Sequence, residues 1–94
     1  MLNLDVKPIQ NGAISEFEDD GQVILYSAGS EQAFILNQPS LVIWKMCDGK
    51  SSVLEITKIL QEHFPESEEQ IKTDVINTIE QLVNNNLLTV IEPN

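Results

Sequence analysis

The chain has 94 residues, of which 41% are hydrophobic, and its formal net charge is −10 at pH 7. This length suffices for one domain, so we expect residues 1–94 to form a single domain with a thin core. All five basic residues are lysines, set against fifteen acids. Because proteins bind nucleic acids mainly through cations that meet phosphates, this balance disfavours DNA, RNA and anionic membranes as partners. The charge either keeps a small domain in solution or attracts a basic partner.

The composition also argues against catalysis, metal binding and membrane insertion. No apolar run approaches the roughly 18 residues of a membrane helix, and no signal-peptide pattern opens the chain, so we expect a cytoplasmic protein. One cysteine, Cys47, and one histidine, His63, disfavour a disulfide and a structural zinc site. Cys47 has no nearby histidine or arginine to lower its pKa, and we interpret it as a buried apolar residue. The sequence therefore predicts a protein without enzymatic activity, metal or cofactor.

Strand and turn signals dominate the first half of the chain. Asp20-Gly21 favours a tight hairpin turn, because both residues accept positive φ angles, and it separates two stretches that alternate, residues 13–19 and 22–27. A second break precedes residues 32–36. These stretches predict a three-stranded antiparallel meander. Residues 4–9 are expected to add an extended edge, although Pro8 weakens it.

Two amphipathic helices are predicted next. Asn37 can cap a first helix that carries Trp44 as a core anchor. Ser52 and Glu55 have the spacing of a capping box and open a second helix, which Pro65 ends. The second helix is expected to direct four apolar residues inward, namely Ile56, Ile59, Leu60 and Phe64.

A third, longer helix is predicted to follow. Ser67 and Gln70 repeat the capping-box spacing, and the three asparagines at 84–86 end the helix because asparagine tolerates the left-handed conformation. Residues 87–91 then run extended. The apolar arc of the helix spans roughly 140°, wider than one stripe of about 100°, and it contains Ile71, Val75, Ile76, Ile79, Leu82 and Val83. Either this helix packs on two neighbours, or one edge faces the core and the other faces a groove.

Three strands followed by three helices give an α+β, winged-helix-like fold, and the ordered motifs along it resemble the PqqD family. The resemblance rests on Phe34-Ile35-Leu36-Asn37, Ile43-Trp44-Lys45-Met46-Cys47-Asp48-Gly49, Ser52-Val53-Leu54-Glu55-Ile56, Asp74-Val75, Leu82 and Leu87-Leu88. It covers about residues 22–88. Asn86 stands where the family usually has glycine, a mild departure because asparagine is the next best left-handed residue.

This resemblance implies a RiPP recognition element, which binds the leader segment of a ribosomally synthesised precursor peptide and presents it to a modifying enzyme, most often a radical SAM protein. The leader is expected to add as a strand to the third strand of the sheet, against the third helix. The peptide-binding residues predicted in this way are Gln32, Ala33, Phe34, Ile35, Leu36, Lys72, Ile76, Ile79 and Val83. Val75 and Leu82 match core positions of the family, which implies a packing role.

Other functions fit the same fold. The runner-up is a winged-helix transcription regulator or another protein-interaction adaptor, and an enzyme ranks third. A DNA-reading third helix would be basic, whereas this one carries Glu68, Glu69, Asp74 and Glu80 against Lys72. The modifying enzyme could also be a cyclase or leader protease of the kind that serves lasso peptides. An exposed edge strand leaves pairing with a second copy open as well.

Overall fold

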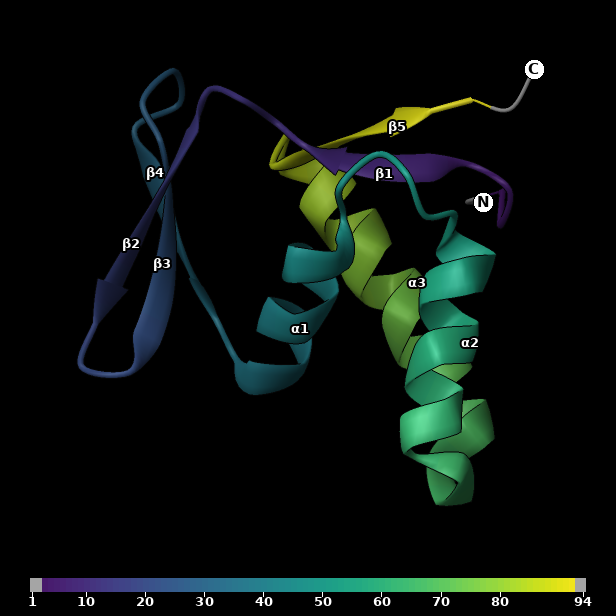
Figure 1. The fold of residues 1–94 in the computed structure, drawn as a ribbon. Coiled ribbons are helices and arrows are strands. Elements are labelled where there is room, and N and C mark those ends of the chain that lie inside the picture. The colour runs from purple at the N-terminus through teal and green to yellow at the C-terminus, as the bar shows by residue number, and fades with distance from the viewer. Residues whose placement is uncertain (1–2, 93–94) are drawn as a thin grey trace.

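In the computed structural model, which describes residues 3–92, three antiparallel strands form one sheet in the order β2-β3-β4 (Figure 1). The strands are β2 (Ile14–Asp19), β3 (Gln22–Ser27) and β4 (Gln32–Leu36). Asp20 and Gly21 join the first two with φ angles of 51° and 80°, the positive values that a two-residue hairpin turn requires. The predicted meander, followed by helices in an α+β arrangement, is confirmed.

The N-terminal strand differs from the expectation because it does not extend this sheet. β1 (Lys7–Gln10) pairs antiparallel with β5 (Leu88–Ile91) in a separate two-stranded sheet. Val6 and Pro8 are buried, and their carbonyl oxygens accept hydrogen bonds from the amides of Val53 (3.0 Å) and Gly49 (2.9 Å). The helices and their connections therefore bury the apolar side chains of this segment and donate hydrogen bonds to two of its carbonyl oxygens. Within residues 3–92, both outer edges of the three-stranded sheet remain without a further strand.

Three α-helices and a short 3₁₀ helix fill the second half: α1 (Gln38–Met46), α2 (Val53–His63), η1 (Pro65–Ser67) and α3 (Glu68–Asn84). Asn37 caps α1, because its Oδ1 accepts from the Ser40 amide at 2.9 Å. The capping box of α2 is confirmed in both directions, with Ser52 Oγ accepting from the Glu55 amide and Glu55 Oε1 from the Ser52 amide. None of these helices, all within residues 3–92, is long and apolar enough to cross a bilayer.

The two ends of α3 differ in how well local sequence predicted them. Ser67 makes no side-chain cap bond, so the second capping box is wrong. Ser67 is the last residue of η1 and has φ −117° and ψ 26°, whereas a capping residue needs an extended backbone. At the other end, Asn86 has φ 62°, and the amides of Asn86 and Leu87 donate to the carbonyls of Val83 and Leu82 at 3.0 and 2.9 Å. This is the Schellman pattern, and it confirms the asparagine stop.

The core lies where the inner face of the sheet, α1 and the two longer helices meet. Its buried hydrophobic residues are Val6, Val23, Leu25, Leu36, Ile43, Trp44, Cys47, Val53, Ile56, Val75, Ile79, Leu82, Leu87 and Leu88. Trp44 is thus the core anchor that the sequence predicted. Two of the four residues expected to point inward from α2 do not: Ile59 is 41% exposed and Phe64 is 59% exposed. Phe64 follows the last residue of α2, where the chain leaves helical geometry, so helical spacing does not fix its direction.

Candidate functional site

The first element of the candidate site is the open edge of β4. Its residues pair with β3 from Ser27↔Gln32 to Val23↔Leu36, and no strand within residues 3–92 pairs with its other edge. Such an edge presents backbone N–H and C=O groups that can form a ladder with an added strand. Of the predicted edge residues, Gln32, Ala33 and Ile35 are exposed, Phe34 is half-buried and Leu36 is buried.

The second element is a groove of about 400 Å³ between α1, α2 and the first half of α3. Its lining residues are Gln38, Pro39, Val42, Ile43, Leu60, Phe64, Ser67, Gln70, Ile71, Asp74 and Val75. Val42 (43% exposed) and Phe64 stand at the mouth, and Ile43 and Val75 are buried. Asp74 Oδ1 accepts from Gln70 Nε2 at 2.9 Å and adds a polar rim. An apolar groove with a few polar groups suits the apolar side chains of an extended peptide.

The groove and the strand edge are neighbours in the chain. β4 ends at Leu36, and α1, whose first turn supplies Gln38 and Pro39 to the groove, begins two residues later. Only Asn37 separates them, so the C-terminal end of β4 and the first turn of α1 lie close together. The strand edge offers backbone pairing, and the groove offers an apolar surface for side chains.

None of the four predicted α3 residues is among those that line this groove. Ile79 is fully buried. Lys72 lines a second cavity of about 230 Å³, which it shares with Leu4 and residues of α2. Ile76 and Val83 are half-buried against the core. Their contact with a peptide stays a prediction, and the α3 residues that line the groove toward α1 are different ones, chiefly Ile71 and Asp74.

Sequence reasoning missed this edge of α3 for a physical reason. The resemblance places the leader against the outer edge of the third helix, whereas Gln70 and Asp74 make the groove-facing edge partly polar. The groove takes most of its apolar lining from other elements, above all Val42 of α1 and Leu60 of α2. The one local signal was Phe64, an aromatic residue placed just outside a helix that ends before Pro65.

Comparison with known proteins identifies the family of this fold. Residues 22–88 match the family described as coenzyme PQQ synthesis protein D (PqqD). The chain belongs to the PqqD family. This confirms the resemblance drawn from the motifs, and the match includes β4, the groove and α3. A search of curated proteins found no match to this PqqD-family chain.

A solved structure titled "TbiB1 in Complex with the TbiA(beta) Leader Peptide" has a similar fold. It aligns with a TM-score of 0.72 and 19% sequence identity, over 85% of this PqqD-family chain and 93% of the other. At this level of identity the likeness establishes the fold. The sheet of three antiparallel strands followed by three helices is therefore shared between the two proteins.

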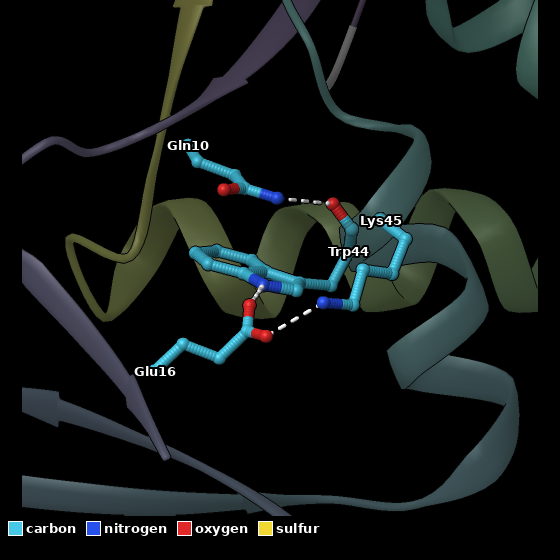
Figure 2. A network of polar contacts seen from close by, with 4 residues as sticks. All are labelled: Gln10, Glu16, Trp44 and Lys45. Atoms are coloured by element: carbon cyan, nitrogen blue, oxygen red, sulfur yellow. Dashed lines mark hydrogen bonds and ion pairs between the residues drawn. The ribbon is translucent and has the colours of Figure 1, made fainter. Parts of the chain in front are cut away.

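A polar network ties the sheet of this PqqD-family chain to its helices (Figure 2). Glu16 of β2 accepts from Trp44 Nε1 at 2.8 Å and from Lys45 Nζ at 2.6 Å. Gln10 Nε2 donates to the Trp44 carbonyl at 3.0 Å. The bond from Lys45, and then the bond from Trp44, hold the pKa of Glu16 below its ordinary value. The network fixes the sheet, and with it β4, relative to α1 and the groove.

Cys47 contributes packing. It is buried, and its Sγ–H donates to the Ile43 carbonyl at 3.1 Å. Burial, and to a smaller extent the charge of Asp48, raises the pKa of this thiol to about 12. At neutral pH the sulfur therefore stays protonated and is a poor nucleophile, which confirms the interpretation of Cys47 as a buried apolar residue.

Proposed function

We propose that this PqqD-family chain binds the leader segment of a ribosomally synthesised precursor peptide as an added strand on β4 and presents it to a modifying enzyme. The observation that carries the proposal is the open edge of β4, which leads within two residues into an apolar groove. Membership of the PqqD family supports it. So does the fold that the chain shares with TbiB1, a protein whose structure was solved with a leader peptide.

The orientation of the added strand decides which part of the leader meets the groove. An antiparallel partner of β4 has its N-terminal end beside Leu36, at the end of β4 nearest the groove. Residues on the N-terminal side of the paired segment therefore lie against Val42, Phe64 and Ile71. The backbone ladder supplies affinity for any compatible strand, and the groove selects apolar side chains.

The first test changes the groove without changing the strand. Leader segments of precursor peptides encoded beside this gene are titrated into the protein, and the dissociation constant is measured by calorimetry. Val42→Asp places a charge at the mouth of the groove, where peptide binding would remove it from water, so we expect a loss of about tenfold to a hundredfold. Ile59→Asp is the matched control, since Ile59 is 41% exposed on α2 and does not line the groove. Equal losses in the two variants would contradict the proposed site.

The second test changes the strand edge. We expect Ala33 and Ile35 to direct their backbone N–H groups outward, so Ala33→Pro should remove one ladder bond and weaken binding, while Ala33→Val keeps the bond. Lys72→Glu tests the α3 residues predicted from the sequence: a loss of affinity would add this edge of α3 to the site, and an unchanged affinity would remove Lys72 from it. Chemical shift changes of the amides should concentrate on residues 32–36 and the groove. Shifts confined to the part of α1 around Trp44 would place the peptide on another face.

The proposal includes the class of the modifying enzyme. PqqD-like proteins most often serve radical SAM enzymes, and we propose a cytoplasmic enzyme of this class as the partner, with the chain itself acting as a non-catalytic adaptor. The test is reconstitution with purified precursor and enzyme. Modification should speed up when the wild-type chain is added and should not when Val42→Asp is added. Rapid modification by a cyclase or leader protease instead would reassign the partner class.

A further inference from the structure

The outer face of the three-stranded sheet carries a row of apolar side chains. Phe17 of β2 pairs with Ile24 of β3, and Ile24 pairs with Ile35 of β4, so the three side chains lie side by side on one face. Phe17 is 55% exposed and Ile35 is 64% exposed. Tyr26, two residues beyond Ile24 and on the same face, is also exposed. We call these four residues the outer row.

The outer row departs from the usual division of an antiparallel sheet. One face of such a sheet packs on the core and the other is normally polar. Here the inner face supplies Val23, Leu25 and Leu36 to the core, yet the opposite face is apolar along its centre. Contiguous exposed apolar residues with a polar rim mark interaction surfaces in many proteins. In Figure 1 the helices lie on one side of the sheet, and the opposite face is left uncovered by the chain as drawn there.

The charges around the outer row indicate what can cover it. The sheet segment, residues 14–36, contains five acids and no lysine: Glu16, Glu18, Asp19, Asp20 and Glu31. Glu16 points to the helices and is paired with Lys45, whereas Asp19 and Asp20 stand exposed at the β2-β3 turn and Glu31 at the β3-β4 turn. A second copy would bring these anionic rims together, and like charges across an interface oppose association. The complementary surface is apolar at its centre and basic around it.

We infer that the outer row is the docking surface for the modifying enzyme, through an apolar patch of that enzyme bordered by lysine or arginine. The inference rests on the proposed function. The row ends at Ile35, on the strand whose open edge is the proposed leader site. A leader strand beside β4 places every second side chain on this same face, next to Ile35. An enzyme docked on the outer row therefore contacts the chain and the bound leader side by side.

The experiment separates enzyme docking from leader binding with two exposed phenylalanines. Phe17 lies on β2, two strands away from the open edge of β4, while Phe64 lines the groove. The probe is the purified modifying enzyme encoded beside this gene, and its affinity for the chain is measured without leader. Phe17→Thr should weaken enzyme binding by at least about tenfold and leave leader affinity unchanged. Phe64→Thr should do the reverse.

The acidic residues around the outer row allow a second, independent test. Asp19→Lys should slow association with the enzyme at low salt by about threefold to tenfold, because rim charges act mainly on the association rate. Glu62→Lys makes the same change on the exposed side of α2 and should change this rate less. Wild-type enzyme affinity in Phe17→Thr, or equal rates in both lysine variants, would overturn the inference. The inference would also be overturned if sedimentation showed that the wild-type chain is a dimer and that Phe17→Thr dissociates it. If instead no leader binds the wild-type chain, it is the proposed function that fails.

Discussion

Replacing Glu16 by alanine should cost far more stability than replacing its ion-pair partner Lys45. Glu16→Ala leaves the indole N–H of buried Trp44 without its acceptor, and an unsatisfied buried donor costs about 1–3 kcal/mol. The Glu16 side chain is 35% exposed, so water replaces part of the lost bond, and we expect about 1–2 kcal/mol. The Lys45 side chain is 55% exposed, and such surface pairs contribute about 0.2–1 kcal/mol, so Lys45→Ala should cost about 0.5 kcal/mol.

The assay is urea unfolding followed by the fluorescence of Trp44, the single tryptophan of the chain. With a denaturant slope of about 1 to 1.5 kcal/mol per molar urea, Glu16→Ala should lower the midpoint by about 1 M. Glu16→Gln keeps an acceptor for the indole and should fall between the two alanine variants. Equal midpoints for Glu16→Ala and Lys45→Ala would refute the reasoning, because they would show that the bond to the indole contributes nothing beyond the surface pair.

The same network predicts a pH dependence. The pKa of Glu16 in the folded chain lies below its ordinary value of 4.5, so the carboxylate stabilises the fold fully above that pH. This stabilisation is lost as the pH falls through the lowered folded pKa. Because acidification also relieves the repulsion of a chain with net charge −10, the useful quantity is the difference in stability between wild type and Glu16→Gln. That difference should shrink below pH 4.5, and a constant difference would contradict the assignment.

Three further predictions concern the fold that holds the site. Gly49→Ala should destabilise the chain by about 1–3 kcal/mol, since φ is +80° and the new Cβ would stand 2.9 Å from Ile9 Cδ1; an unchanged urea midpoint would contradict this. Ser52→Ala should cost about 1 kcal/mol in the same assay, whereas Ser67→Ala, which removes no cap bond, should cost almost nothing. Cys47 should react with a disulfide reagent at pH 8 only as fast as the chain unfolds, and rapid reaction of the native protein would show that its thiol is not buried as described.

Local chemistry explains which parts of the fold were predictable. Asp20-Gly21 and the Ser52-Glu55 box act through backbone angles and bonds within a few residues, so their sequence signals were sufficient. The asparagine stop of α3 is of the same kind, with Asn86 at φ 62°. The partner of β1 was not predictable in this way. Its pairing with β5, some 80 residues away in the sequence, depends on how the helices bring the ends of the chain together.

The two parts of the candidate site differ in the same way, because the β4 edge depends on local sequence and the groove depends on packing between helices. The β4 edge follows from strand order, which the turns between the strands already specify. The groove is assembled from α1, α2 and α3, with Val42, Phe64 and Ile71 brought together by packing between helices, and helical spacing within one helix does not contain that information. On α3, Ile76 and Val83 pack against the core, so an apolar residue on this helix marks a packing contact as readily as a groove.

The two faces of the sheet give the added strand a double role. Side chains alternate along a strand, so a leader paired with β4 directs one set toward the side of Phe34 and the core and the other set toward the side of Ile35 and the outer row. In the proposed complex, the first set would control leader binding and the second would face the docked enzyme. An exchange at a leader position beside Ile35 should therefore leave binding to the chain intact while slowing modification. An exchange at a position that enters the groove beside Val42 should weaken binding first, and modification should recover when the peptide concentration is raised.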